Sequence, residues 1–300
     1  MAIALVPALL IAQTAGASAR GVDPPKGAWV GAWVQPADYS KTSVMRAVNG
    51  LQDRIDHKLD IVHNYYGWKA AFPTWKERWN LRNGRIPMVS WNGYNTDAIR
   101  RGDQDDWIRR RADAVDGLGR RIFIRWLWEP ESQGSGLVVS PASYVAAWRH
   151  IVSIFHRRGA TNASFVWCPT AWAFRDGTAS KYWPGRRYVD WVCADGYNWY
   201  PGRSGSEWVS FRKIFSGAYR FAARVNKPLM AGEVGVQHDP RRPLRRARWI
   251  TAGRQTLKRD YPRLKAFVYF FAERVYDWRL TTSTAIAALR RMAKDPYFNR

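Results

Sequence analysis

The sequence is poor in the residues that hold metal ions or carry thiol chemistry. Its 300 residues include two cysteines and five histidines. Neither cysteine stands in a C-x-x-C motif and no two histidines are spaced H-x-x-x-H, so a zinc centre is not expected. The chain also lacks a G-x-S-x-G nucleophile elbow, a P-loop and a dinucleotide-binding glycine motif. We therefore expect no metal, no organic cofactor and no serine nucleophile.

Acidic residues are scarce as well. The chain has 24 Asp and Glu against 48 Lys and Arg, a formal net charge of +24. The electrostatic field of so positive a protein attracts anionic polymers, including acidic cell-wall polymers. The arginine pairs are spread over many segments and no DNA- or RNA-binding motif is present, so a specific nucleic-acid partner is not expected. An Arg-rich surface without a partner is the plainer alternative.

Long apolar runs are absent except at the N-terminus. Residues 2–12 are almost wholly apolar, and the Ala-Ser-Ala at 17–19 satisfies the small-x-small rule of signal peptidase. The run is shorter than the ~18 residues of a membrane span. We expect residues 1–19 to be a cleaved export signal, with a short membrane anchor as the alternative. Residues 20–300 would then form a single domain, because no linker divides them. We expect this domain to be secreted, to be a monomer and to have no transmembrane segment.

Eight short β-branched or aromatic runs alternate with longer amphipathic stretches. Such alternation indicates parallel strands joined by right-handed crossovers, and eight units close into a barrel. We therefore predict an α/β fold of the (β/α)8 TIM-barrel type. The predicted strands are Ala28 to Val34, Ile61 to Tyr65, Ile86 to Trp91, Ile122 to Trp128, Ser164 to Cys168, Trp191 to Asp195, Pro228 to Glu233 and Leu264 to Phe271.

The clearest predicted helix follows the fourth strand, where Ser140 is placed to cap it and Pro141 suits its first turn. Helical patterns also run over 206–225, 244–257 and 281–293, whereas 171–187 shows none and reads as a long loop. Cys168 and Cys193 lie at the ends of neighbouring predicted strands. An exported protein could join them, although small buried thiols suit both positions equally.

Catalytic groups of such barrels lie at the carboxyl ends of the strands, and two glutamates stand there. The fourth strand ends in Glu129 and the seventh in Glu233. Hydrolysis of a glycosidic bond with retention requires two carboxyl groups about 5–5.5 Å apart, one protonated and one ionised. The alternative is that Glu129 has a structural role and forms an ion pair with Arg125. Strand alternation places these two residues on the same side of the strand. Glu131 and Glu273 follow their strands and are expected at the rim.

Aromatic residues are abundant, with 18 tryptophans. Aromatic faces stack on the C–H faces of sugar rings, while polar side chains bind the hydroxyls. Most of these rings should be core, and those at the strand ends are the candidates for binding substrate. With the nearby polar groups, the candidates for substrate binding are Trp91, Arg125, Trp128, Trp167, Tyr197, Asn198, Trp199 and Tyr269.

Taken in order, the motifs resemble those of glycoside hydrolase family 26, which contains β-mannanases, β-1,3-xylanases and mixed-linkage glucanases. The similarity covers roughly residues 28 to 280. The matching pieces are Ile99-Arg100-Arg101-Gly102-Asp103, Arg125-x-x-x-Glu129, Ser143 to His150, Val166-Trp167, Tyr182-Trp183-Pro184-Gly185, Tyr188 to Trp191, Asp195-Gly196-Tyr197-Asn198, Lys227 to Gly235 and Asp277-Trp278-Arg279.

The resemblance implies roles for particular residues. Glu129 would be the acid/base, Glu233 the nucleophile, and Tyr197 a hydrogen-bond partner of the nucleophile. Arg125 would support them. Where the family has a histidine before the acid/base, this chain has Trp128, so the sugar that is read at the cleavage point stays open.

The sequence thus predicts a retaining endo-glycosidase acting on a β-linked mannan, xylan or β-glucan. A non-catalytic carbohydrate- or cell-wall-binding barrel is the alternative, and the departure at Trp128 is its main support. A binder of anionic polymers without glycan specificity is a further alternative, which rests on the net charge alone.

Overall fold

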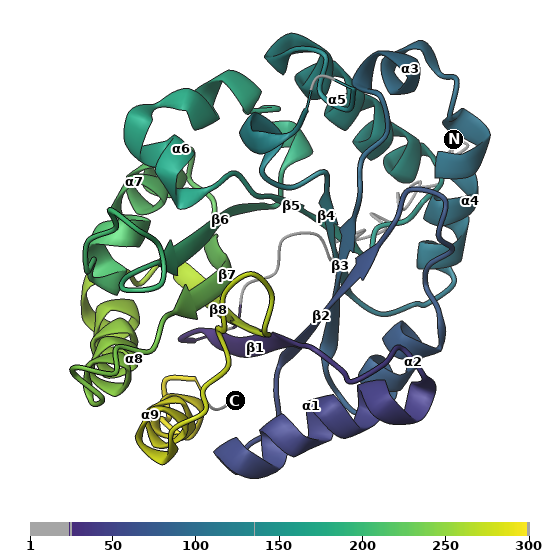
Figure 1. Cartoon of the computed structure of the whole chain (residues 1–300). Helices are drawn as coiled ribbons and strands as arrows, with labels where there is room; N and C mark the ends of the chain where they lie inside the picture. The colour runs from purple at the N-terminus through teal and green to yellow at the C-terminus, as the bar shows by residue number, and fades with distance from the viewer. Residues whose placement is uncertain (1–23, 25, 135, 299–300) are drawn as a thin grey trace, which may run out of the picture.

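The computed structural model describes residues 24, 26–134 and 136–298. Eight parallel strands form a closed barrel in chain order, and β8 pairs with β1. Helices surround the barrel (Figure 1). The predicted (β/α)8 fold is confirmed. The strands are β1 (Trp29–Val34), β2 (Ile61–Tyr66), β3 (Ile86–Trp91), β4 (Ile122–Trp126), β5 (Ala163–Trp167), β6 (Trp191–Asn198), β7 (Leu229–Val236) and β8 (Leu264–Phe271).

The helices follow the predicted pattern with shorter bounds. Ser140 caps α5, where its hydroxyl accepts a hydrogen bond from the Ser143 N–H at 3.1 Å. The segment 171–187 was expected to be a loop, and it contains short helices instead. The helical elements are α1 (Lys41–Ile55), α2 (Trp75–Arg82), α3 (Thr96–Arg101), α4 (Asp105–Asp116), η1 (Pro130–Ser132), α5 (Pro141–Arg157), α6 (Ala171–Asp176), η2 (Thr178–Tyr182), η3 (Arg186–Tyr188), α7 (Phe211–Arg224), α8 (Arg245–Gln255), η4 (Thr256–Asp260) and α9 (Ser283–Ala293).

Strand alternation divides the core into two layers. Side chains that point inward, such as Met88, Val166 and Met230, fill the barrel, and their outward neighbours pack under the helices in a larger cluster. This alternation therefore decides which residues at a strand's carboxyl end can reach the barrel mouth.

Strand β7 interrupts the alternation at Gly232. Ala231 pairs with Ala194 and Glu233 pairs with Asp195, so β7 has one residue more than β6 between these pairs. A bulge of this kind re-aims the side chains that follow it. A Cβ added to Gly232 would lie 2.3 Å from Cys193 Sγ inside the barrel. Both Gly232 and Glu233 consequently face the interior.

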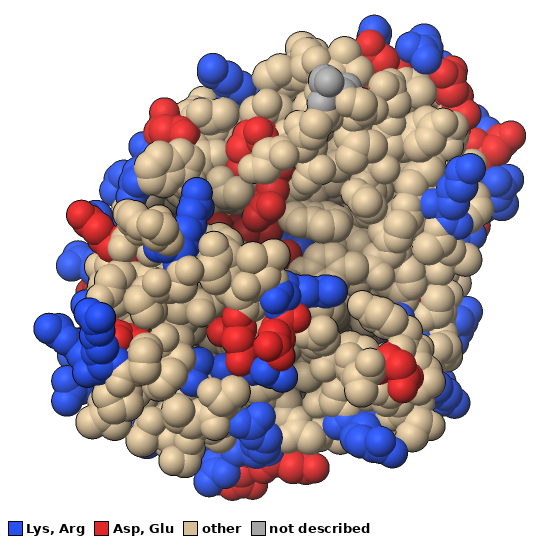
Figure 2. Space-filling view, viewed as in Figure 1, with Lys and Arg blue, Asp and Glu red and all other residues tan. Residues whose placement is uncertain are grey.

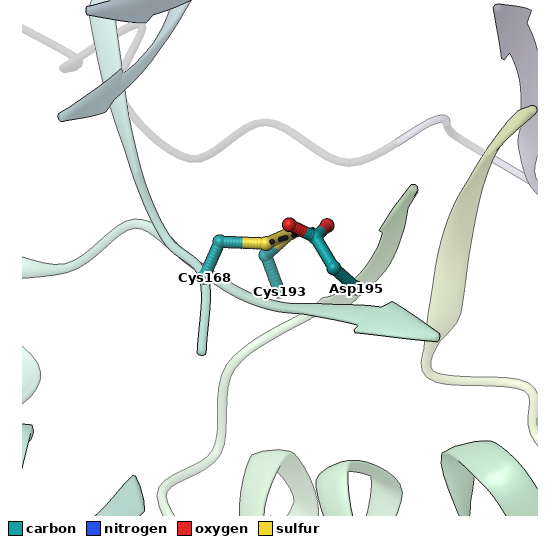
Figure 3. Close-up of side chains that lie close together, drawn as sticks. All are labelled: Cys168, Cys193 and Asp195. Atoms are coloured by element: carbon teal, nitrogen blue, oxygen red, sulfur yellow. Dashed lines mark hydrogen bonds between the residues drawn. A yellow bond between two sulfur atoms is a disulfide. The ribbon is translucent and has the colours of Figure 1, made fainter. Parts of the chain in front are cut away.

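Cys168 and Cys193 form a disulfide, which settles the choice that the sequence left open. Asp195 lies beside it, with one carboxylate oxygen 3.2 Å from Cys168 Sγ (Figure 3). The cross-link therefore joins β6 to the end of β5 inside the barrel, next to the Gly232 bulge.

Within the described ranges, no helix is long and apolar enough to cross a membrane. The export signal expected over residues 1–19 lies outside the described residues.

Candidate active site

Glu233 is held by three hydrogen-bond donors. The Tyr65 hydroxyl donates to Oε1 at 2.6 Å and the Tyr197 hydroxyl to Oε2 at 2.5 Å. Arg125 Nη2 also donates to Oε1 in a salt bridge. The residue is 6% exposed and lines the barrel mouth. These donors stabilise a carboxylate and restrict its orientation.

Arg125 organises the groups beneath Glu233. It is fully buried, and its Nη1 lies 2.8 and 2.7 Å from the two carboxylate oxygens of Asp195. Its Nε donates to Ser90 Oγ at 2.6 Å. Burial raises the pKa of Asp195, and the positive charge of Arg125 opposes that shift. Arg125 therefore pairs with Asp195 and Glu233. The Arg125–Glu129 ion pair considered from the sequence is absent among the described contacts.

Glu129 follows a sharp change of backbone direction. Strand β4 ends at Trp126, two residues earlier than predicted, because Leu127 and Glu129 both adopt positive φ (40° and 51°). Such conformations cost about 1–3 kcal/mol each and cluster at functional sites. Two backbone bonds hold the turn: Leu127 N–H donates to Trp91 O at 2.9 Å and Glu129 N–H to Cys168 O at 2.7 Å.

The carboxyl of Glu129 has a different environment from that of Glu233. Within the described ranges, no hydrogen bond to its side chain is present. Burial and then the negative charge of Glu233 raise its pKa to about 7, while Arg125 opposes the shift. A carboxyl group that stays protonated near neutral pH is suited to donate a proton.

Both glutamates line one open cleft of 880 Å³ at the carboxyl ends of the strands. In Figure 2, acidic side chains lie in the hollow near the middle of this face, and basic side chains lie beside the hollow as well as around the periphery. The aromatic residues that line the cleft are Trp172, Tyr197, Trp199, Phe270, Tyr276 and Trp278. The cleft thus combines paired carboxyls with aromatic walls.

Trp128 contacts the groups that hold Glu233, although it is not among the residues that line the cleft. The guanidinium carbon of Arg125 lies 5.1 Å from its ring centroid, and the Tyr65 ring packs edge-on at 5.3 Å. The half-buried indole therefore points toward the barrel mouth. It does not pack outward on a helix.

Five of the substrate-binding predictions are wrong in this structure. Arg125 is fully buried and pairs with Asp195 and Glu233, so it supports the site from beneath. Trp91, Trp167 and Tyr269 are fully buried, because their places in strand alternation direct them outward under the helices. Tyr269 donates its hydroxyl hydrogen to Trp278 O at 2.8 Å. Asn198 is 1% exposed and donates to Val209 O at 2.7 Å, so it fixes a loop. Trp199, by contrast, lines the cleft.

The sequence predicted Arg125 and Tyr197 beside Glu233, but it did not predict the other residues of this network. Tyr65 and Asp195 were noted at strand ends without a role. Ser90 and His63 complete the network, with His63 Nε2 at 2.6 Å from Ser90 Oγ. Inward alternation on β2, β3 and β6 was the signal that could have identified them.

The competing carboxylates have other functions. Glu131 Oε1 accepts from Thr170 N–H at 2.6 Å, so it ties the loop after β4 to the loop after β5. Glu273 forms a surface salt bridge with Arg279 at 2.5 Å. The negative charge of Glu131 adds to the raised pKa of Glu129, but within the described ranges neither Glu131 nor Glu273 contacts the donors that hold Glu233.

One cluster of potential metal ligands is found in the described part of the chain: Cys168, Cys193 and Asp195. The two sulfurs are bonded to each other, so neither is available as a thiolate ligand. The arrangement at the barrel mouth is therefore one of carboxyl, hydroxyl and guanidinium groups, which suits proton transfer and nucleophilic attack.

Two glutamates that line one cleft at the mouth of a (β/α)8 barrel place the fold and site with the barrel glycosidases. Within that class, the resemblance to glycoside hydrolase family 26 that the motifs predicted is confirmed at the level of the fold, which solved GH26 mannanases share, and a curated relative at 36% identity is named an endoglucanase. No protein-family model matches the chain.

The chain is 36% identical over 279 residues to Endoglucanase H of Acetivibrio thermocellus, a match that covers 88% of this chain and 30% of the relative. It is 26% identical over 220 residues to mannan endo-1,4-beta-mannosidase A and B of Caldalkalibacillus mannanilyticus, covering 70% of this chain and 37% of the relative. The chain thus spans about a third of the length of these curated relatives.

The fold also matches solved structures. A GH26 beta-mannanase from Bacteroides ovatus superposes with a TM-score of 0.65 and 13% identity, covering 92% of this chain and 90% of that one. At that identity the comparison establishes the shared barrel fold.

Proposed function

We propose that the protein is a retaining endo-glycoside hydrolase that cleaves a β-linked polysaccharide, with Glu129 as acid/base and Glu233 as nucleophile. The observation that carries the proposal is the contrast between the two carboxyls in one cleft. Glu233 accepts three hydrogen bonds, one from a guanidinium. Glu129 has none and has a pKa raised to about 7. The two groups are thus prepared for attack and for proton donation respectively.

In the first step, the Glu233 carboxylate attacks the anomeric carbon as the glycosidic C–O bond breaks. Glu129 gives its proton to the departing oxygen, so the leaving sugar departs as a neutral alcohol. Glu233 is now an ester and its negative charge is gone. Burial still raises the pKa of Glu129, but the added repulsion from Glu233 disappears, so the pKa falls and Glu129 becomes a more effective base.

In the second step, Glu129 takes a proton from a water molecule whose oxygen attacks the anomeric carbon. The ester bond to Glu233 breaks, and the carboxylate returns to its three donors. Two displacements on opposite faces of the sugar leave its configuration unchanged. Tyr65, Tyr197 and Arg125 hold the leaving carboxylate oxygens at the position from which attack began.

Among the possible substrates, a β-linked glucan is the one to test first, because the relative with 36% identity is named as an endoglucanase. Mannan and xylan follow, since other relatives are named as a mannosidase and a beta-1,3-xylanase. An open cleft lined by aromatic rings suits an internal position of a chain, which favours endo action. The sizes of products released from each polymer distinguish endo from exo cleavage.

We also propose that the protein is exported and works outside the cell as a monomer. The disulfide inside the barrel supports export, because such bonds persist in oxidising compartments. The net charge of +24 supports attraction to acidic wall polymers in that setting.

Nucleophile replacement tests the proposed mechanism. Glu233→Ala should lower kcat on the true substrate by several orders of magnitude without unfolding the barrel, and azide should restore turnover by occupying the vacated position. The azide product should have inverted configuration, because only one displacement then occurs. Glu129→Ala should lose activity without producing that inverted product.

Glu131→Ala serves as the matched control, since Glu131 binds a loop N–H and takes no part in the chemistry. If Glu233→Ala keeps near-normal activity, the assigned nucleophile is wrong. If wild type binds glycans and cleaves none across mannans, xylans and β-glucans, the barrel is a carbohydrate-binding protein.

A further inference from the structure

A second, smaller pocket lies behind the nucleophile. It has a volume of 160 Å³ and is formed by residues of β1, β2, α1, α2 and the loop after β8. Tyr65 lines it, and the hydroxyl of the same residue donates to Glu233. Arg274 lines both this pocket and the large cleft. The pocket is therefore adjacent to the cleavage point and separated from it by these two side chains.

The charged groups of the pocket are both positive. Lys76 and Arg274 line it, and within the described ranges neither forms a salt bridge. Each instead faces aromatic rings: Lys76 Nζ lies 5.8 Å from the Tyr39 ring centroid, and the Arg274 guanidinium carbon lies 5.1 Å from that of Trp33. No Asp or Glu is among the lining residues. Two cations without a carboxylate are an unbalanced charge that an anion would complement.

Two buried polar groups at the pocket are also without partners. Asn64 is 8% exposed, and its Nδ2 has no hydrogen-bond acceptor in the described structure. His63 is 1% exposed, and its Nδ1 is likewise unpaired. Arg125 Nη2 lies 3.5 Å from His63 Nε2 and can only donate. This leaves the proton on Nδ1, so the unpaired atom is a donor.

Buried donors without acceptors are costly and are normally satisfied. Here they belong to the same pocket as two unpaired cations, and the pocket is roomy enough to admit polar groups. At its edge the Tyr39 ring is 68% exposed, which leaves an aromatic face for a sugar.

We propose that this pocket binds a uronic acid unit of the polysaccharide, with the carboxylate toward Lys76 and Arg274 and the pyranose ring beside Tyr39. The inference extends the proposed function, because it adds an acidic unit to the substrate on one side of the cleavage point. Arg274 lines both the pocket and the cleft, which places the pocket next to the proposed cleavage point.

Calorimetric titration of the full chain with free D-glucuronate, D-glucose and acetate tests the proposal without requiring turnover. We expect glucuronate to bind at least tenfold more tightly than either glucose or acetate, since only glucuronate supplies both ring and charge. Lys76→Met and Arg274→Met should each weaken glucuronate binding at least tenfold. Raising the salt concentration should weaken it as well, because screening reduces the attraction.

Lys181→Met is the matched control. Lys181 is an exposed cation outside both the pocket and the cleft, so its loss should leave glucuronate binding unchanged. Equal binding of glucuronate and glucose would overturn the proposal, as would binding that survives both pocket variants. Acetate binding as tightly as glucuronate would show a site for charge alone and would also overturn it. Failure here leaves the azide-rescue test untouched, so the two proposals fail separately.

Discussion

Glu129 and Glu233 carry the same functional group, and their surroundings give them different properties. Glu233 lies in a strand interior and meets an arginine and two tyrosine hydroxyls. Glu129 stands on a turn of two left-handed residues, where burial and a neighbouring negative charge favour its protonated form. Opposed environments for two carboxyls are the general means by which an acid and a nucleophile are made from one residue type.

The raised pKa of Glu129 predicts the alkaline limb of the pH profile. The proton must be present for the acid step, so kcat/KM should be highest below pH 7. Above the pKa of about 7 it should fall about tenfold per pH unit as the proton is lost. A substrate whose leaving group needs no proton should lack this limb. A profile that stays flat to pH 9 on the polysaccharide would show that Glu129 is not the acid.

The two tyrosines on Glu233 are expected to act through that carboxylate. Tyr197→Phe and Tyr65→Phe should each lower kcat roughly 10- to 100-fold, because each removes one hydrogen bond to a charged group. Thermal unfolding should change little, since the ring remains.

Tyr144→Phe is the control for this pair. Its hydroxyl is buried and has no partner among the described residues, so removing it should leave kcat unchanged. If Tyr197→Phe lowers the unfolding temperature while kcat is unaffected, Tyr197 is a packing residue.

At the scale of the element, the bulge in β7 is what brings Glu233 into the barrel. Regular alternation would have turned its side chain toward the helices along with Ala231. Gly232 permits the bulge to approach the disulfide, because any Cβ there would meet Cys193 Sγ at 2.3 Å and Asp195 Oδ1 at 3.0 Å. Strand irregularity and cross-link are therefore parts of one arrangement.

Gly232→Ala should accordingly reduce both stability and activity. Overpacking of this kind costs roughly 1–3 kcal/mol, and displacement of Asp195 should disturb Arg125 and through it Glu233. We expect kcat to fall at least 100-fold. Chemical denaturation and steady-state kinetics measure the two effects.

Gly50→Ala in α1 is the comparison, since a Cβ there meets nothing within 4 Å. That change should raise stability by up to ~1 kcal/mol and leave kcat alone. Normal kcat in Gly232→Ala would mean that Glu233 does not depend on the bulge.

The sequence predicts the strands and the two glutamates, but not which strand-end side chains face the barrel mouth. All eight strands were predictable, because each is a short apolar run between amphipathic stretches. Glu129 and Glu233 were predictable because a glutamate ending an apolar strand needs a reason. Trp91, Trp167 and Tyr269 were assigned wrongly, since inward and outward positions alternate and a strand end alone does not say which applies.

Contacts between strands distant in sequence were out of reach. Asp195 and Tyr65 matter only because closure of the barrel brings β2, β4, β6 and β7 to one mouth. The left-handed turn at Leu127 depends on Gly93, where a Cβ would lie 2.3 Å from the Leu127 side chain. Neither the contacts across the barrel mouth nor the contact between Gly93 and Leu127 leaves a pattern in neighbouring residues of the sequence.

At the scale of the molecule, the cleft extends beyond the two glutamates to Trp172 on α6. This side chain is 62% exposed, and Arg175 lies over its ring at 3.9 Å. Both residues line the cleft. An indole held in place on one face and open on the other suits a sugar unit distant from the cleavage point.

Trp172→Ala should raise KM for a polysaccharide roughly 3- to 10-fold and leave kcat nearly unchanged, because the lost stacking contributes equally to ground and transition states. A short substrate that spans only the cleavage point should be unaffected, and Trp172→Phe should recover most of the loss. Equal effects on long and short substrates would place Trp172 outside the substrate path.

The pairing of Glu129 with Glu233 over a buried arginine has a consequence for the electrical state of the interior. In the proposed mechanism, Glu129 gives up its proton and becomes the anion when attack turns Glu233 into a neutral ester. When water releases the ester, the charge returns. The total charge facing Arg125 is therefore the same at both stages of turnover, and no counter-ion has to enter or leave the barrel. The rate at saturating substrate should therefore not depend on ionic strength. The rate at which the cationic protein first encounters an acidic polymer should depend on it strongly.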